Sequence, residues 1–162
     1  MAIYMNYNGL KVKGNLTADG YKDWINVGSM QFGVGRGITM ESGSMANREA
    51  SRPSISEITI SKTMDQSSPG LFKDSVTGDA GVKVIIDVVQ TGAQKLEKFC
   101  SYELEQCLIS SYTVSAGADG APVETISLSF AKLITSYTAA DKANKAGSPT
   151  RVGYDLELGK PL

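Results

Sequence analysis

The sequence predicts a mainly β domain that carries one short α-helix. Short runs of β-branched and aromatic residues recur along the chain, and Gly, Ser, Asn and Asp separate them. One segment alone combines helix start and stop signals at a suitable distance. A length of 162 residues fits one domain, so we expect residues 1–162 to fold as a single unit.

Alternation of apolar and polar residues predicts strands in the first half of the chain. Residues 3–7 alternate and end at the turn dipeptide Asn8-Gly9. Residues 24–32 are strand-like, but Gly28 interrupts them, and we expect a bulge or a close backbone approach there. Residues 55–63 alternate cleanly and predict another strand.

The second half predicts longer strands. Residues 82–89 are apolar on both faces apart from two charged residues, which is typical of a central strand. The apolar parity changes near Glu105-Gln106, and this predicts a bend within a long strand. Residues 126–130 and 152–158 alternate and predict two further strands.

The predicted helix begins after Ser67, which can act as N-cap before Pro69, and Gly78 can end it. Leu71, Phe72 and Val76 form an apolar patch with which the helix could plug one end or side of a barrel. Three stretches look irregular: residues 33–53, residues 116–122, and residues 139–150, which have the composition of a flexible linker. The first is long enough to indicate a contact role.

Composition argues against several classes of function. The net charge of −1 provides no basic face for nucleic acid. No apolar run approaches the roughly 18 residues of a membrane span, and the N-terminus lacks the features of a signal peptide. We therefore expect no nucleic-acid partner and no membrane insertion.

The sequence also offers little for catalysis or cofactors. It contains no histidine, which removes Ser-His-Asp and Cys-His mechanisms. We expect Cys100 and Cys107 to be buried thiols in a reducing cytoplasm. Trp24 is expected to anchor the core, and Glu103 and Glu105 to lie on a solvated or interface face. We predict no enzyme, no cofactor and no metal site.

Six ordered stretches of the chain match the pattern of a known family. The two most specific are Lys62-x-x-Asp65-x-Ser67-Ser68-Pro69, before the helix, and Glu124-x-Ile126-Ser127-Leu128-x-Phe130, in a strand. The others lie at residues 22–25, 40–43, 102–111 and 153–156. In this order and spacing they resemble the Hcp family, the haemolysin-coregulated proteins of bacterial type VI secretion systems.

The resemblance implies a compact two-sheet β-barrel with one short α-helix and an extended loop. It implies that six copies form a ring, and that rings stack into the inner tube of a contractile injection machine. The implied partners are other copies of the chain, the spike protein and sheath of the machine, and small effector proteins that the lumen carries and chaperones. The chain would be made in the bacterial cytoplasm and secreted without a signal peptide. Since it ends at Leu162, soon after the last expected strand, we expect no appended effector domain.

These implications direct attention to contact surfaces. We expect the loop at residues 35–53 to lie against the next subunit or ring, and its candidate contact residues are Met40, Glu41, Met45, Arg48, Glu49 and Arg52. The turn at Thr91, Gly92, Ala93 and Gln94 is expected at the rim where rings meet. Gln31, in the strand at residues 25–32, is the candidate to face cargo in the lumen.

Two alternatives to a type VI tube subunit remain at this point. A tail-tube protein of a phage-like particle would share the architecture. In another class, a closed β-barrel could bind a small ligand in an apolar interior, as lipocalins do.

Overall fold

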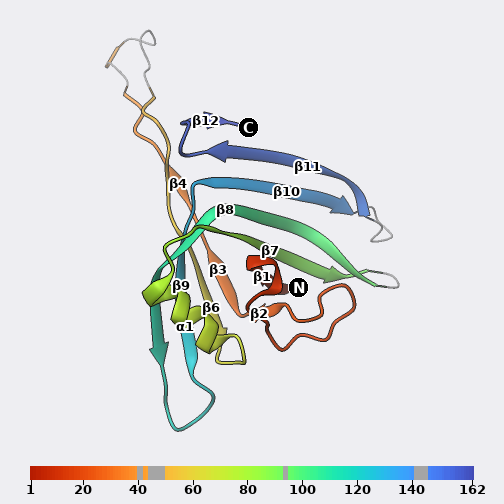
Figure 1. The fold of residues 1–162 in the computed structure, drawn as a ribbon. Coiled ribbons are helices and arrows are strands. Elements are labelled where there is room, and N and C mark those ends of the chain that lie inside the picture. The colour runs from red at the N-terminus through yellow and green to blue at the C-terminus, as the bar shows by residue number, and fades with distance from the viewer. Residues whose placement is uncertain (40–41, 44–49, 93–94, 141–145) are drawn as a thin grey trace.

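The computed structural model describes residues 1–39, 42–43, 50–92, 95–140 and 146–162, and antiparallel strands dominate it (Figure 1). The strands are β1 (Ala2–Tyr7), β2 (Ile25–Val27), β3 (Ser29–Gln31), β4 (Val34–Gly35), β5 (Ser54–Ile55), β6 (Ile58–Thr63), β7 (Val82–Thr91), β8 (Leu96–Ser115), β9 (Val123–Ser129), β10 (Lys132–Ala140), β11 (Ala146–Asp155) and β12 (Lys160–Pro161). A 3₁₀ turn, η1 (Asn8–Leu10), follows β1, and the α-helix is α1 (Ser68–Thr77). The predicted mainly β class with a short helix is confirmed.

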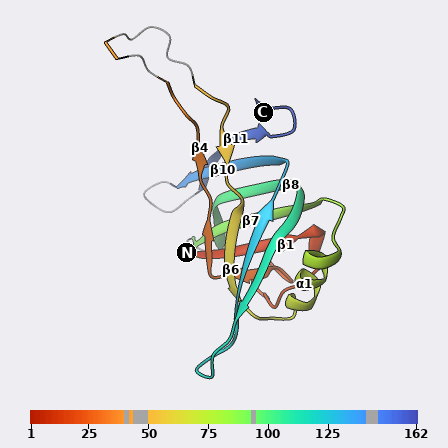
Figure 2. The ribbon, with the colours of Figure 1, turned by 90° about the vertical axis from the view of Figure 1, so that its left-hand side faces the viewer.

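The strands form two sheets that share β8. Sheet A has the order β12-β11-β10-β8-β7-β1-β2, and sheet B has the order β3-β6-β9-β8. Because β2 and β3 are separated by one residue, the pairings β1–β2/β3–β6–β9–β8–β7–β1 form a continuous circuit, the two-sheet barrel (Figures 1 and 2).

Both predicted irregularities lie where the chain passes from one sheet to the other. Gln106 has φ 55°, and it separates the part of β8 that pairs with β10 from the part that pairs with β9. Gly28 separates β2 from β3, and its N–H donates to the carbonyl of Ser61 at 2.7 Å. A local change of direction in each strand therefore closes the barrel.

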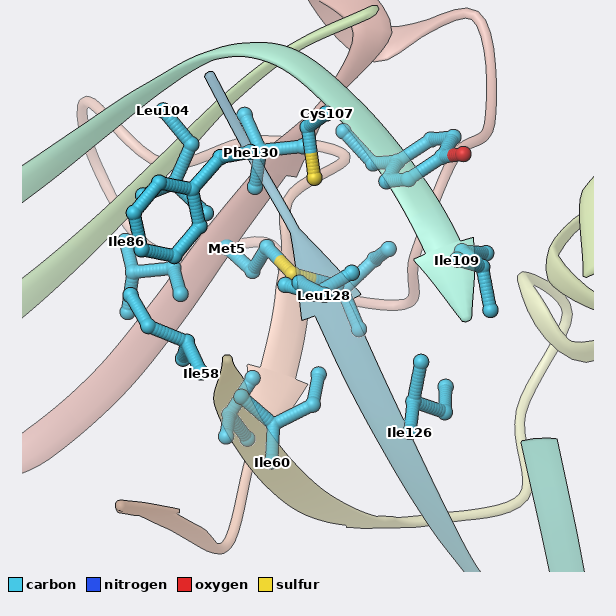
Figure 3. Close-up of a cluster of buried hydrophobic side chains, with 14 of the residues drawn as sticks. Met5, Ile58, Ile60, Ile86, Leu104, Cys107, Ile109, Ile126, Leu128 and Phe130 are labelled. Carbon is cyan, nitrogen blue, oxygen red and sulfur yellow. The ribbon is translucent and has the colours of Figure 1, made fainter. Parts of the chain in front are cut away.

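Apolar side chains from both sheets fill the space between them (Figure 3). The labelled members of this core are each at most 8% exposed: Met5, Ile58, Ile60, Ile86, Leu104, Cys107, Ile109, Ile126, Leu128 and Phe130. They occupy the barrel interior, which argues against the small-ligand alternative.

The helix has the predicted ends but not the predicted apolar face. Ser67 is its N-cap position and Gly78 its C-cap position. Leu71 is fully buried, whereas Phe72 and Val76 are 53% and 64% exposed. The helix therefore covers one side of the barrel with only part of the predicted patch, because α1 lies on β8 at the surface and inserts one side chain into the core.

The expected linker at residues 139–150 is also wrong. Strand β10 runs to Ala140 and β11 starts at Ala146, so the described part of this stretch is an antiparallel ladder in which Thr138 opposes Pro149. Proline is tolerated here because β12 pairs only with Tyr154 and Asp155, which leaves this part of β11 at a sheet edge. The last predicted strand ends at Asp155 and not at Leu158, since the chain turns back there into β12.

Residues 33–53 are more regular than predicted. Strands β4 and β5 pair, Ile38 bridges Ala50, and Gly37 accepts a backbone hydrogen bond from Ser51 at 2.8 Å. We call the described residues 33–39 and 50–55 the arm. It extends away from the barrel as a two-stranded projection (Figures 1 and 2).

Candidate assembly and cargo surfaces

Part of each predicted contact set falls within the described residues. Arg52 is exposed on the arm, and its guanidinium lies beside Gly159 in the β11–β12 turn. Thr91 ends β7 and is exposed, and the N–H of Gly92 donates to the carbonyl of Lys95 at 2.8 Å. The remaining predicted contact residues lie outside the described residues: Met40, Glu41, Met45, Arg48, Glu49, Ala93 and Gln94.

The arm carries apolar side chains that the barrel does not cover. Val34 is 57% exposed and Ile38 is 51% exposed. Single exposed apolar residues are ordinary, but these two lie on a narrow projection where nothing else of the described chain can bury them. Contact with another chain would remove them from water.

Sheet B has an open edge on each side. Within the described chain, β3 pairs only with β6, and β8 beyond Cys107 pairs only with β9. Leu108 and Val114, in that part of β8, are 38% and 43% exposed. Unpaired edge strands with apolar side chains are templates for pairing with another chain.

The face of sheet B that points away from the core is lined by hydroxyl groups, and Gln31 lies on it. Cross-strand partners share a face, and the register places Val123 and the following polar residues together in this hydroxyl face: Ser29, Gln31, Thr59, Ser61, Thr63, Ser111, Thr113, Ser115, Thr125 and Ser127. The Ser29 and Ser61 hydroxyls are hydrogen-bonded at 2.6 Å, and those of Thr59 and Ser127 at 3.3 Å. In β3, β6, β9 and the part of β8 beyond Cys107, the one Lys is Lys62, and its side chain is buried on the opposite side.

A cavity of about 470 Å³ opens at the Gln31 end of the hydroxyl face. It is lined by Gln31, Phe32, Gly33, Ser56, Glu57 and Thr59. Glu57 accepts a hydrogen bond of 2.6 Å from the hydroxyl of Ser110. Composition and spacing did not single out Glu57, because its position depends on how β6 and β8 come together across β9.

The two most specific sequence motifs meet inside the protein. Lys62 of the first motif forms a fully buried ion pair with Glu124 of the second, at 3.1 Å. Burial, together with the nearby Glu124 carboxylate, raises the pKa of Tyr112 to about 12. The motifs thus have a structural role that links β6 to β9.

A second buried carboxylate fastens the segment before β2 to sheet A. Asp87 accepts hydrogen bonds from Tyr21 at 3.2 Å and from Ser101 at 2.6 Å, and it pairs with Lys98 at 3.4 Å. The Trp24 ring packs edge-on against Tyr21, with 4.8 Å between the ring centroids. Trp24 is only half-buried and borders a surface cavity, so the expectation that it anchors the core is wrong.

The other candidate groups have structural roles. Glu103 pairs with Arg151 at 3.0 Å and Glu105 with Lys132 at 3.5 Å. Cys107 is buried, and burial raises the pKa of its thiol to about 12, whereas Cys100 is half-buried.

The described ranges hold no group of three His, Cys, Asp or Glu residues that could bind a metal ion. In the same ranges no helix combines the length and apolar character of a membrane span.

The chain matches the model of a known protein family. The family model described as "Type VI secretion system effector, Hcp" matches residues 4–137, which include both motifs. The chain belongs to the Hcp family. The resemblance on which the sequence interpretation depended is therefore confirmed, and the match favours type VI secretion over a phage-like particle. No curated protein sequence matches the chain.

Solved structures agree with this assignment of an Hcp fold. A structure described as a type six secretion system protein is 28% identical, with 99% of each chain covered and a TM-score of 0.89. Hcp1 from Salmonella typhimurium is 23% identical, with 99% of this chain and 98% of that chain covered and a TM-score of 0.75. A type VI secretion system effector from Yersinia pestis is 17% identical, with 94% and 98% covered and a TM-score of 0.73.

Proposed function

We propose that this Hcp-family chain is a structural, non-catalytic subunit of the type VI secretion inner tube. Six copies close a ring, rings stack into a tube, and the lumen carries and chaperones small effector proteins. The observation that carries the proposal is the form of sheet B, which has an open edge on each side and a continuous hydroxyl face between them.

The open edges support ring formation. If the β3 edge of one copy pairs with the β8 edge of the next, the contact is head-to-tail, and repeated contacts of this kind close a ring when the rotation permits. Backbone groups on both edges then gain hydrogen-bond partners, and Leu108 and Val114 lose exposed surface.

The arm and the β7–β8 turn support contacts between subunits or rings. The projection of the arm gives it reach beyond its own barrel, and its exposed apolar residues need cover. Arg52 can bind a carboxylate of a neighbour through two parallel hydrogen bonds, which lysine cannot do. The turn that begins at Thr91 and Gly92 would meet the adjacent ring.

The hydroxyl face supports a role for Gln31 toward cargo. Edge-to-edge pairing would continue this face around the ring, so its polar groups would line a water-filled lumen. We assign Gln31 to this lumen wall. The remaining partners in this function are the spike protein and sheath, and the chain would leave the cytoplasm with the machine.

Mass in solution tests the ring. Multi-angle light scattering after size-exclusion chromatography should give six times the chain mass of 17.2 kDa. Val114→Lys places a charge at the open β8 edge and should shift the protein toward monomer, while Leu158→Lys, a matched change in the 62% exposed turn residue, should not. A wild-type protein that stays monomeric at high concentration would contradict the proposal.

Gln31 has its own test. Gln31→Ala, which adds no charge to the β3 edge, should leave the ring mass unchanged and alter the retention of co-expressed effector proteins. A ring that forms normally and retains effectors equally well would remove Gln31 from the cargo surface.

A further inference from the structure

The cavity beside Gln31 places one charged group on an otherwise neutral surface. Its volume is about 470 Å³, and Glu57 provides the carboxylate among its lining residues. No ion pair joins Glu57 to a Lys or Arg of the described chain. The carboxylate therefore has a negative charge that this part of the chain does not neutralise.

We infer that this cavity binds the side chain of a Lys or Arg residue of a cargo protein. The inference rests on the proposed carrier function and adds the chemistry by which cargo is selected. A basic side chain is the complement of a lone carboxylate, because opposite charges attract more strongly beside low-dielectric protein than in bulk water.

The hydrogen bonds around Glu57 prepare it for this role. The Ser110 hydroxyl donates to Oε2 of Glu57 at 2.6 Å, and it also lies 3.3 Å from the carbonyl of Ser127. Ser110 stands at an irregularity in the β8–β9 register, between Ile109 and Ser111, which turns it toward Glu57. One carboxylate oxygen is thus held in place, and Oε1 is left to accept from a bound cation.

The other lining residues suit a long basic side chain. Lys and Arg carry several N–H donors and no acceptor, so they need acceptor groups around them. Gln31 and Thr59 supply an amide oxygen and a hydroxyl oxygen in the same cavity. Phe32 also borders the cavity, while its ring packs against the core and against Tyr102, with 5.7 Å between centroids.

This arrangement favours selective but weak contacts. Glu57 is exposed, so we expect each pocket to favour a basic over a neutral side chain by only about two- to fivefold. Six pockets in a ring would multiply this preference for cargo that presents several basic residues. Because each contact is weak, the cargo could also leave.

Labelled peptides test the inference. Three fluorescein-labelled peptides share a Gly/Ser/Ala background and carry Arg, Gln or Glu at the same spaced positions. Fluorescence anisotropy at low ionic strength should show the wild-type protein binding the Arg peptide at least about threefold more tightly than the Gln peptide. Glu57→Gln should abolish this preference, and Glu57→Lys should reverse it toward the Glu peptide.

A matched control removes the same charge elsewhere. Glu157→Gln changes an exposed carboxylate in the β11–β12 turn and should leave the Arg preference intact. Absence of the preference in the wild-type protein, or its survival in Glu57→Gln, would overturn the inference. The mass of each variant is measured in parallel, because the cavity lies within one chain. A ring without Arg preference overturns the inference alone, whereas Arg preference in a monomer supports the pocket and counts against the ring.

Discussion

Nζ of Lys62 lies 3.1 Å from Oε2 of Glu124, and both side chains are fully buried. Lys62 also lies 3.1 Å from Asp65 and 3.4 Å from the Ser68 hydroxyl, at the start of α1. One ammonium group therefore joins β6, β9 and the helix, and it accounts physically for the two motifs that mark the chain as an Hcp protein.

Removing either partner of this pair should destabilise the fold. Lys62→Met leaves two carboxylates without their cation and should lower the free energy of unfolding by about 3–5 kcal/mol. Glu124→Gln should cost less, because Asp65 still neutralises Lys62. Urea unfolding measures both. Lys132→Met, which breaks the more exposed pair with Glu105, should cost less than about 1 kcal/mol. Equal losses of unfolding free energy for Lys62→Met and Lys132→Met would show that the buried ion pairs stabilise the fold no more than an exposed pair does.

Replacing Gln106, at the bend in β8, by glycine should not lower the stability of the fold. Gln106 has φ 55°, a conformation that costs a non-glycine residue about 1–2 kcal/mol. Gln106→Gly should leave stability unchanged or raise it by up to about 1 kcal/mol, since the gain is offset by greater freedom of the unfolded chain. Gln90→Gly, the same change inside β7, should destabilise by roughly 0.5–1 kcal/mol. Thermal unfolding compares the two, and a larger loss at position 106 than at position 90 would contradict the prediction.

Stability should fall at alkaline pH. Burial raises the pKa of Cys107 from 9.0 to about 12, so the folded state holds a proton that the unfolded state releases. This contribution is complete below pH 9.0 and is lost as pH rises toward about 12, at up to about 1.4 kcal/mol per pH unit. Tyr112, raised from 10.0 to about 12, adds to the loss at higher pH. Urea unfolding across this range should show a smaller slope for Cys107→Ala than for the wild type; an equal slope would rule out Cys107 as a source.

Shortening the arm should separate ring formation from ring stacking. The N–H of Gly37 donates to the Ser51 hydroxyl at 2.8 Å, so the two strands are close enough there to be joined by an Asn-Gly turn in place of residues 38–50. Pairing of β4 with β5 is retained, and thermal stability should change little. We expect rings by light scattering but no tubes by electron microscopy. Tubes of normal length would show that the outer arm makes no essential contact.

Local features of the sequence were sufficient to predict most elements. Alternation placed β1, β6 and β9, the interruption at Gly28 marked a passage between the sheets, and Ser67 and Gly78 marked the helix ends. Each of these depends on a residue and its neighbours in the chain, through backbone conformation or side-chain periodicity. Gln31, by contrast, was singled out by the family resemblance and not by local alternation.

Contacts between distant segments were decided only by the tertiary structure. Nothing near Lys62 indicates that Glu124 will neutralise it, and nothing near Glu57 indicates that Ser110 will hold its carboxylate. The supposed linker at residues 139–150 forms strand because β10 offers it a partner, which composition does not reveal. The sequence by itself determined the strand faces, the family and the absence of histidine chemistry. The structure decided which faces meet, because strand register and sheet closure depend on pairing partners that are remote in the chain.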